Sequence, residues 1–198
     1  EELDLLAQAL KSGHLTEGDF VKKSENIMRK KTSGLAALAM PSCTAALEAA
    51  IILADIKTGD EVIVPSFTFT STATAIVMRG GVPVFVDCKP ETMNVCTNAI
   101  ATAITPLTKA VMVMHYGGVA CDMDVIVDLC QKHDLFLIED AAQAIDCYYQ
   151  GKPLGSFGDC AAFSFHQTKN INCGEGGMLV INNPDIIKRA EIIRDKGT

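Results

Sequence analysis

Lys169 is the residue whose type and setting most directly suggest covalent chemistry. It lies in the segment Phe163–Asn170, directly after an apolar run and shortly before the glycine-rich segment Gly174–Gly177. A lysine amine can form an imine with an aldehyde, and glycines let a backbone approach a ligand closely. Lysines are also common in surface loops, so this segment alone leaves an ordinary loop residue as the alternative.

Two further segments could hold a charged, ring-shaped ligand. Asp140 follows the apolar run that ends at Glu139, and a carboxylate there could keep a pyridine nitrogen protonated. The segment Pro41–Leu47 carries hydroxyls at an expected strand-to-helix junction, where free N–H groups favour an anion such as a phosphate. In both segments the alternative is an ordinary helix cap, because Ser, Thr and Asp favour that position.

Phe69 offers an aromatic face in the segment Pro65–Thr72. It could stack on a planar ring, although an aromatic in such a place usually belongs to the core. His115-Tyr116-Gly117 closes another apolar run and adds polar groups after a strand.

Short apolar runs alternate with helical patterns along the chain, and this rhythm predicts the elements that position these residues. The expected strands are 36–40, 61–65, 82–86, 110–115, 135–139, 160–165 and 178–181. The expected helices are 3–11, 19–31, 44–53, 71–78, 98–104 and 124–133, the last with Val125, Ile126 and Leu129 on its apolar face. Such alternation predicts an α/β fold of three layers, with helices on both faces of a mostly parallel seven-stranded sheet.

The last strand is expected to run antiparallel, because the connection 166–177 contains no helical pattern. Ligands of such sheets gather beyond the carboxyl ends of the strands. Asp140, Lys169 and the segment Pro41–Leu47 all follow strands, so we expect them to meet at that edge.

Composition limits the classes of partner. The 198 residues are 48% hydrophobic with a net charge of −7 and no basic stripe, which disfavours nucleic acid and anionic membranes. None of the eight cysteines forms a C-x-x-C pair, so we expect reduced thiols in a cytoplasmic protein and no metal site. No apolar run reaches the roughly 18 residues that span a bilayer.

The chain is expected to be one cofactor-binding large domain, with N-terminal helices in 1–31 and an α/β core in 32–198. It begins with Glu1 and ends at Gly197-Thr198, which we interpret as a fragment without the C-terminal small domain.

Taken together, these segments resemble the sugar-nucleotide aminotransferase family of pyridoxal-phosphate enzymes, with the aspartate-aminotransferase type of fold. The resemblance rests on Ser-Cys-Thr-Ala-Ala-Leu, Pro-Ser-Phe-Thr-Phe, Glu-Asp-Ala-Ala-Gln, Ser-Phe-His-Gln-Thr-Lys-Asn and Gly-Glu-Gly-Gly. It implies that Lys169 is the catalytic Schiff-base lysine of pyridoxal 5'-phosphate. It further implies a set of cofactor contacts: Asp140 at the pyridinium nitrogen, Gln143 near the ring hydroxyl, Cys43, Thr44 and Ser164 at the phosphate, and Phe69 stacked on the ring.

The resemblance also implies a reaction, namely amination of a nucleotide-linked 4-keto-6-deoxy sugar with glutamate as donor, by a homodimer, for surface polysaccharide or deoxyamino-sugar synthesis. The segments Arg79–Gly81 and His115–Asp124 are similar to those of members that aminate TDP-4-oxo-6-deoxy-D-glucose. Two alternatives remain: a sugar dehydratase of the same fold, whose members place His where this chain has Lys169, and a cofactor-binding domain without turnover. A Rossmann dehydrogenase is disfavoured, because no G-x-G-x-x-G follows the first strand.

Overall fold

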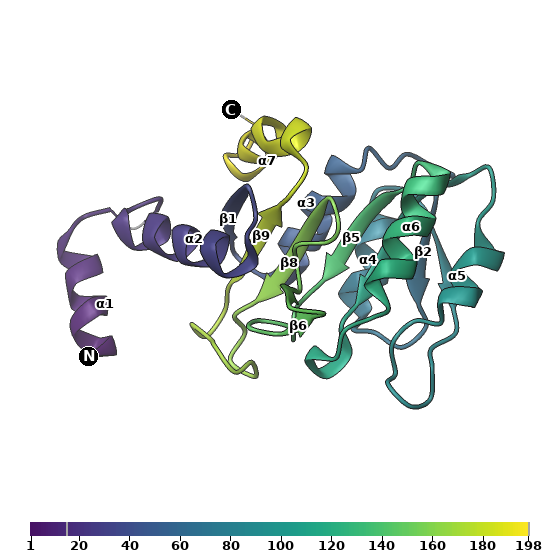
Figure 1. The fold of residues 1–198 in the computed structure, drawn as a ribbon. Helices are drawn as coiled ribbons and strands as arrows, with labels where there is room; N and C mark the ends of the chain where they lie inside the picture. Colours follow the sequence, from purple (N-terminus) through teal and green to yellow (C-terminus); the bar gives the residue numbers. More distant parts are fainter. Residues whose placement is uncertain (15, 198) are drawn as a thin grey trace.

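A seven-stranded sheet forms the centre of the structure, a computed structural model that describes residues 1–14 and 16–197. The strand order is β1-β9-β8-β5-β4-β2-β3 (Figure 1). The bounds are β1 Ala36–Met40, β2 Glu61–Pro65, β3 Val82–Val86, β4 Thr108–Met114, β5 Phe136–Asp140, β8 Cys160–Ser164 and β9 Gly177–Ile181. Of these strands, β9 alone runs antiparallel to its neighbours, β1 and β8. The predicted mostly parallel sheet with an antiparallel last strand is confirmed.

Helices cover both faces of the sheet. The bounds are α1 Glu2–Lys11, α2 Asp19–Thr32, α3 Cys43–Leu53, α4 Thr70–Met78, α5 Thr97–Ala103, α6 Met123–His133 and α7 Ile187–Arg194, with short 3-10 turns η1 Tyr116–Gly118 and η2 Pro184–Ile186. One buried cluster joins α3, α4 and α7 to one face, and two others join α5, α6 and α2 to the opposite face. The predicted three layers are therefore present.

The sequence pattern explains these elements. The central strands are apolar at nearly every position because both faces of the sheet are covered, and all five positions of β9 are buried. Helix α3 is buried at six of its eleven residues. Helix α6 is amphipathic, but its buried residues are Met123, Ile126 and Cys130. The expected apolar face with Val125 was wrong, because Val125 is exposed.

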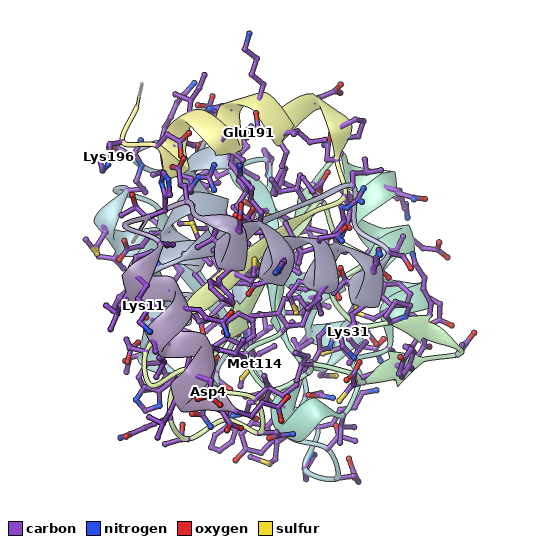
Figure 2. All side chains as sticks on the ribbon, turned by 90° about the vertical axis from the view of Figure 1, so that its left-hand side faces the viewer. Asp4, Lys11, Lys31, Met114, Glu191 and Lys196 are labelled. Atoms are coloured by element: carbon purple, nitrogen blue, oxygen red, sulfur yellow. The ribbon has the colours of Figure 1, made fainter. Side chains whose placement is uncertain are left out.

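Helix α1 stands apart from the sheet. None of its residues is buried, and Leu3, Leu6 and Leu10 are all exposed. Figure 2 looks onto α1 and α2 and shows Asp4 and Lys11 on α1 in front of the body of the molecule. In the part of the chain that the structure describes, no helix is both long and apolar enough to cross a membrane.

Two short strands and one helix were not predicted, nor were the 3-10 turns. The short strands β6 (Tyr148–Tyr149) and β7 (Lys152–Pro153) form a hairpin whose turn residues, Gln150 and Gly151, both have positive φ. Such a pair of turn residues is typical of a tight hairpin. Helix α7 follows η2, where the Asn183 side chain accepts a hydrogen bond from Asp185 N–H and Pro184 opens the turn. Strand β5 extends to Asp140, one residue beyond the expected end.

Candidate active site

The register of the sheet brings the chemically interesting segments to one edge. Gly177, at the start of the antiparallel β9, pairs with Met40 on one side and with Ser164 on the other. Met114, at the end of β4, pairs with Asp140. The carboxyl ends of β1, β4, β5 and β8 therefore meet at this edge, as expected for a ligand site of an open α/β sheet.

A cavity of about 470 Å³ opens at this edge. All seven residues predicted from the sequence line it: Cys43, Thr44, Phe69, Asp140, Gln143, Ser164 and Lys169. Residues without an assigned role also contribute, among them Ser71, His166 and Glu175. Lys169 is the only amine among the described lining residues. The structure thus brings the predicted set together, and the role of each residue remains a prediction.

The start of α3 forms one end of the cavity. Ser42 is the N-cap, and its Oγ accepts a hydrogen bond from Ala45 N–H at 3.1 Å. The first N–H groups of a helix have no intrahelical partner, so those of Cys43 and Thr44 are free to hold an anion. Gly177 packs tightly behind this turn, because a Cβ there would lie 2.4 Å from the carbonyl carbon of Ser42.

Thr44 is tied to α4 by a hydrogen bond between its Oγ1 and Ser71 Oγ at 2.8 Å. The sequence did not indicate this pairing, which fixes the first turn of α3 against the first turn of α4. Burial raises the pKa of the neighbouring Cys43 thiol well above its usual range. Cys43 therefore contributes as a neutral thiol rather than as a reactive thiolate.

Asp140 is almost completely buried at the centre of the cavity wall. Its Oδ2 accepts a hydrogen bond from Thr72 Oγ1 at 2.8 Å, and its Oδ1 accepts one from Ala142 N–H at 3.2 Å. Burial raises the pKa of the Asp140 carboxyl, although these two bonds and the charge of Lys169 oppose the shift. A positively charged ligand beside this buried carboxylate would stabilise its ionised form.

Replacing Asp140 with asparagine is expected to stabilise the cofactor-free protein at pH 7 by about 1 kcal/mol, because it removes a buried charge while keeping the shape. Because burial raises the pKa of Asp140, the folded wild-type protein protonates this carboxyl at a higher pH than the unfolded chain does. The advantage of Asp140→Asn should therefore shrink as the pH falls through the raised pKa. Urea unfolding at several pH values measures it, with the exposed Asp128→Asn as control. An advantage that grows on acidification would contradict this account.

Lys169 lies in the loop between β8 and β9. Its backbone N–H donates to His166 O at 2.9 Å, and Asn172 Nδ2 donates to its carbonyl at 3.4 Å. Ser164, at the end of β8, accepts a hydrogen bond from His166 N–H at 3.3 Å. The Ser164 hydroxyl therefore keeps its own hydrogen to donate into the cavity.

Gln143 and Phe69 complete the cavity from two other loops. Gln143 Oε1 accepts a hydrogen bond from Gly117 N–H at 2.6 Å, which leaves its Nε2 as the donor on the cavity side. Phe69 precedes α4 and is 70% exposed. It is thus not a core residue, and its ring is available to cover a planar ligand.

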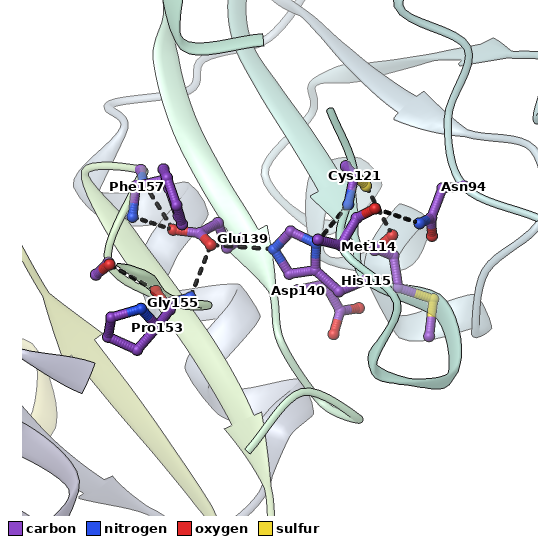
Figure 3. Close-up of polar contacts among 12 residues, drawn as sticks. Asn94, Met114, His115, Cys121, Glu139, Asp140, Pro153, Gly155 and Phe157 are labelled. Atoms are coloured by element: carbon purple, nitrogen blue, oxygen red, sulfur yellow. Dashed lines mark hydrogen bonds and ion pairs between the residues drawn. The ribbon is translucent and has the colours of Figure 1, made fainter. Parts of the chain in front are cut away.

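A buried ionisable pair lies on the opposite face of β5 from Asp140 (Figure 3). Glu139 Oε2 contacts His115 Nε2 at 3.0 Å, and both side chains are fully buried. His115 Nδ1 accepts Cys121 N–H, so the ring carries its hydrogen on Nε2 and donates it to Glu139. Glu139 also accepts three backbone N–H groups, from Gly155, Phe157 and Gly158. The pair joins the ends of β4 and β5 to the loop 155–158.

Sequence reasoning gave no supporting role to Ser71, Thr72 and Glu139, and it noted His115 only as a polar residue after a strand. Thr72 carried no usable signal, because it lies in the hydroxyl-rich start of α4 and only the structure shows that it is completely buried. A buried hydroxyl of this kind needs a polar partner. His115 and Glu139 carried a weak signal, since each ends an apolar strand and both could belong to the same sheet edge. No local pattern linked Ser71 to Thr44.

Comparison with known proteins assigns this fold and its cavity to a family of aminotransferases. The chain belongs to the DegT/DnrJ/EryC1/StrS aminotransferase family, which it matches over residues 1–198. It is 41% identical over 193 residues to the spore coat polysaccharide biosynthesis protein SpsC of Bacillus subtilis, covering 98% of this chain and 50% of that protein. It is 41% identical over 180 residues to the GDP-perosamine synthase of Caulobacter vibrioides, covering 91% of this chain and 48% of that protein.

Solved structures agree with this assignment. An aminotransferase from Psychrobacter cryohalolentis superposes with a TM-score of 0.94 at 36% identity, over 98% of this chain and 50% of that one. DesI in the presence of its TDP-sugar product gives 0.90 at 36% identity, over 98% and 50%. The pyridoxal-phosphate form of a sugar aminotransferase from Streptococcus pneumoniae gives 0.91 at 30% identity, over 96% and 54%. The predicted family is confirmed, and the pyridoxal-phosphate form of the Streptococcus protein agrees with the predicted cofactor. The chain spans about half the length of these relatives.

Proposed function

We propose that this chain binds pyridoxal phosphate through Lys169 and forms the cofactor-binding domain of an enzyme that aminates a nucleotide-linked 4-keto-6-deoxy sugar. The observation that carries the proposal is the convergence of Lys169, Asp140 and the start of α3 on one cavity. An amine, a buried carboxylate and an anion-binding helix start are the groups that an aldehyde, a pyridine nitrogen and a phosphate require.

The residues present fit that cofactor. The free N–H groups at Cys43 and Thr44 and the Ser164 hydroxyl are donors for a phosphate, and the cavity has no Lys or Arg other than Lys169 among its described lining residues. Asp140, whose pKa is raised by burial, regains its charge against a protonated ring nitrogen. The volume of about 470 Å³ also lies within the range of small-molecule sites.

Each residue then has a definite task. Bound pyridoxal phosphate supplies an aldehyde and an electron-withdrawing ring. Asp140 holds the proton on the ring nitrogen, which keeps the ring electron-poor throughout the reaction. Gln143 Nε2 donates to the ring oxygen, and Phe69 covers one face of the ring and excludes water. Lys169 Nζ would hold the cofactor through its aldehyde and would move a proton to and from the reacting carbon of the substrate.

Names of relatives support the substrate class. GDP-perosamine synthase and DesI with its TDP-sugar product both point to nucleotide-linked deoxy sugars, and SpsC points to a surface polysaccharide. We extend the proposal to glutamate as the donor, a homodimeric assembly in the cytoplasm, and a role in surface polysaccharide or deoxyamino-sugar synthesis. The region beyond this domain in the longer relatives is proposed to close over the sugar.

The 198 residues alone are expected to turn over weakly or not at all, because the relatives are about twice as long and the region beyond this domain is proposed to close over the sugar. Incubation of a protein that includes that region with pyridoxal phosphate, glutamate and TDP-4-oxo-6-deoxy-D-glucose is therefore the test of this function. The expected result is an amino sugar, seen by mass spectrometry, that forms together with 2-oxoglutarate. Loss of water from the sugar without uptake of nitrogen would identify the dehydratase instead. Absence of any sugar product from TDP-linked and GDP-linked substrates, with cofactor bound, would contradict the proposed substrate class.

A further inference from the structure

Asn94 lies outside the cavity, yet it contacts the turn that holds Gln143. It is buried, with 3% of its surface exposed, in the connection between β3 and α5. Its Oδ1 accepts a hydrogen bond from Tyr116 N–H at 2.9 Å. Its Nδ2 donates to the carbonyls of Val119 and Ala120, at 2.9 and 3.0 Å. The Asn94 side chain therefore binds the first residue of η1 and the two residues that follow the turn.

The turn η1 in turn binds Gln143. Gly117 adopts a left-handed conformation, with φ 61° and ψ 15°, and its N–H donates to Gln143 Oε1. Gly118 also has a positive φ, and a Cβ there would lie 2.7 Å from Cys147 Sγ and 3.0 Å from Gln143 O. The turn thus packs directly on the segment that carries Gln143. A shift of the turn would move Gly117 N–H and, with it, the Gln143 side-chain amide whose Oε1 accepts from that group.

His115 secures the other side of the same segment. Its ring accepts a hydrogen bond from Cys121 N–H and donates one to Glu139 (Figure 3). The two ends of the segment 115–121, its base, are therefore joined to each other and to β5. Asn94 lies beside this base in the same view. Within the turn, Gly118 N–H donates to His115 O and Val119 N–H donates to Tyr116 O. The three Asn94 bonds add a side-chain restraint from outside the turn, at Tyr116, Val119 and Ala120.

We infer that Asn94 is a positioning residue, which orients the Gln143 amide toward the cofactor ring by clamping the turn Tyr116–Gly118. This inference rests on the proposed function for the identity of the cofactor, but not for the clamp itself. Among the described residues no acceptor engages Gln143 Nε2, so the amide has its donor free for a ligand. Asn94 fixes that donor without touching the ligand.

Two variants test the inference, and a third serves as a matched control. Asn94→Ala removes all three bonds, and Asn94→Asp keeps the acceptor for Tyr116 N–H while losing the donor to both carbonyls. Asn182→Ala is the control, because Asn182 Nδ2 also donates to two backbone carbonyls, those of Gly155 and Gly158, in a different loop. If Asn94→Ala fails to fold, Asn94→Asp carries the test.

The first measurement is cofactor binding in a double-mutant cycle with Gln143→Ala. Asn94→Ala or Asn94→Asp is expected to weaken pyridoxal-phosphate binding about three- to tenfold and to shift the visible absorption of the bound cofactor. In the Gln143→Ala background the same change should weaken binding by less than about twofold, because the group being positioned is gone. Equal weakening in both backgrounds, or an equal effect of Asn182→Ala, would overturn the inference.

The second measurement needs no cofactor. Hydrogen exchange of the peptide that contains Gly117 is expected to accelerate at least about tenfold in Asn94→Ala and Asn94→Asp. Asn182→Ala should accelerate the peptide around Gly155–Gly158 instead. Unchanged exchange at Gly117 in a folded Asn94 variant would overturn the clamp. A wild-type protein that binds no pyridoxal phosphate would refute the proposed function, and the exchange experiment would still decide the clamp.

Discussion

Replacing Lys169 with alanine is expected to lower turnover about 10³-fold at saturating cofactor and substrates, the usual effect of removing a positioned acid–base group. The physical reason is that Lys169 is the only amine among the described residues that line the cavity. Without it, none of the described lining residues can form an imine with the cofactor aldehyde, and the remaining acid–base groups, His166 and Glu175, do not replace an amine held at that carbon. Steady-state assays of amino-sugar formation measure the loss.

A matched variant separates this effect from a general loss of stability. Lys188 is exposed on α7, outside the cavity, and Lys188→Ala is expected to leave turnover within about twofold of wild type, because surface substitutions of this kind have little effect. Turnover of Lys169→Ala comparable to wild type would show that another group performs the chemistry.

The Asp140→Asn variant is expected to lower kcat about 10²- to 10³-fold, the range found when one preorganised electrostatic group is removed. The amide cannot keep the proton on the ring nitrogen, so the ring no longer stabilises developing negative charge. The variant should still bind cofactor, because Lys169 and the start of α3 are untouched. The same substitution should stabilise the cofactor-free protein, a combination that misfolding cannot produce.

Thr72→Val tests the role of Asp140 with a smaller change, because it removes one hydrogen bond to the carboxylate and keeps the carboxylate itself. The hydrogen bond from Thr72 lowers the pKa of Asp140 against the effect of burial. Its removal is expected to raise that pKa further and to shift the acidic limb of the kcat/KM profile to higher pH. A shift to lower pH, or full activity of Asp140→Asn, would contradict the role given to Asp140.

The fold was largely predictable because its signals are local. Each strand of the main sheet is a short apolar run between turns, and the helix-free connection around Gly174–Gly177 indicated the antiparallel β9. The hairpin of β6 and β7 was missed, since strands of two residues carry no periodicity. Helix α7 was missed although Ile187, Ala190 and Ile193 pack on the core at helical spacing, because the helix has only eight residues and the exposed Ile192 weakens the apolar pattern.

The candidate site was predictable for the residues that end strands or begin helices. Asp140, Lys169 and the segment Pro41–Leu47 follow from their positions at one sheet edge. Cys43, Ser164 and the expected roles of all these residues came from the family resemblance. The supporting contacts were not predictable, because each joins residues far apart in sequence. Thr44 meets Ser71 and Thr72 meets Asp140 only when α4 packs beside α3. Such pairs depend on helix packing rather than on any local pattern.

The most direct test of the central claim is chemical trapping of the cofactor. The protein is mixed with pyridoxal phosphate, reduced with borohydride, digested, and the modified residue is located by mass spectrometry, with Lys169→Ala as control. The account predicts a stable label on Lys169 and its disappearance in the variant. Among the residues that the structure describes, Lys169 carries the one amine that shares a cavity with Asp140 and the start of α3. A label confined to other lysines, or an unchanged label in Lys169→Ala, would contradict the account.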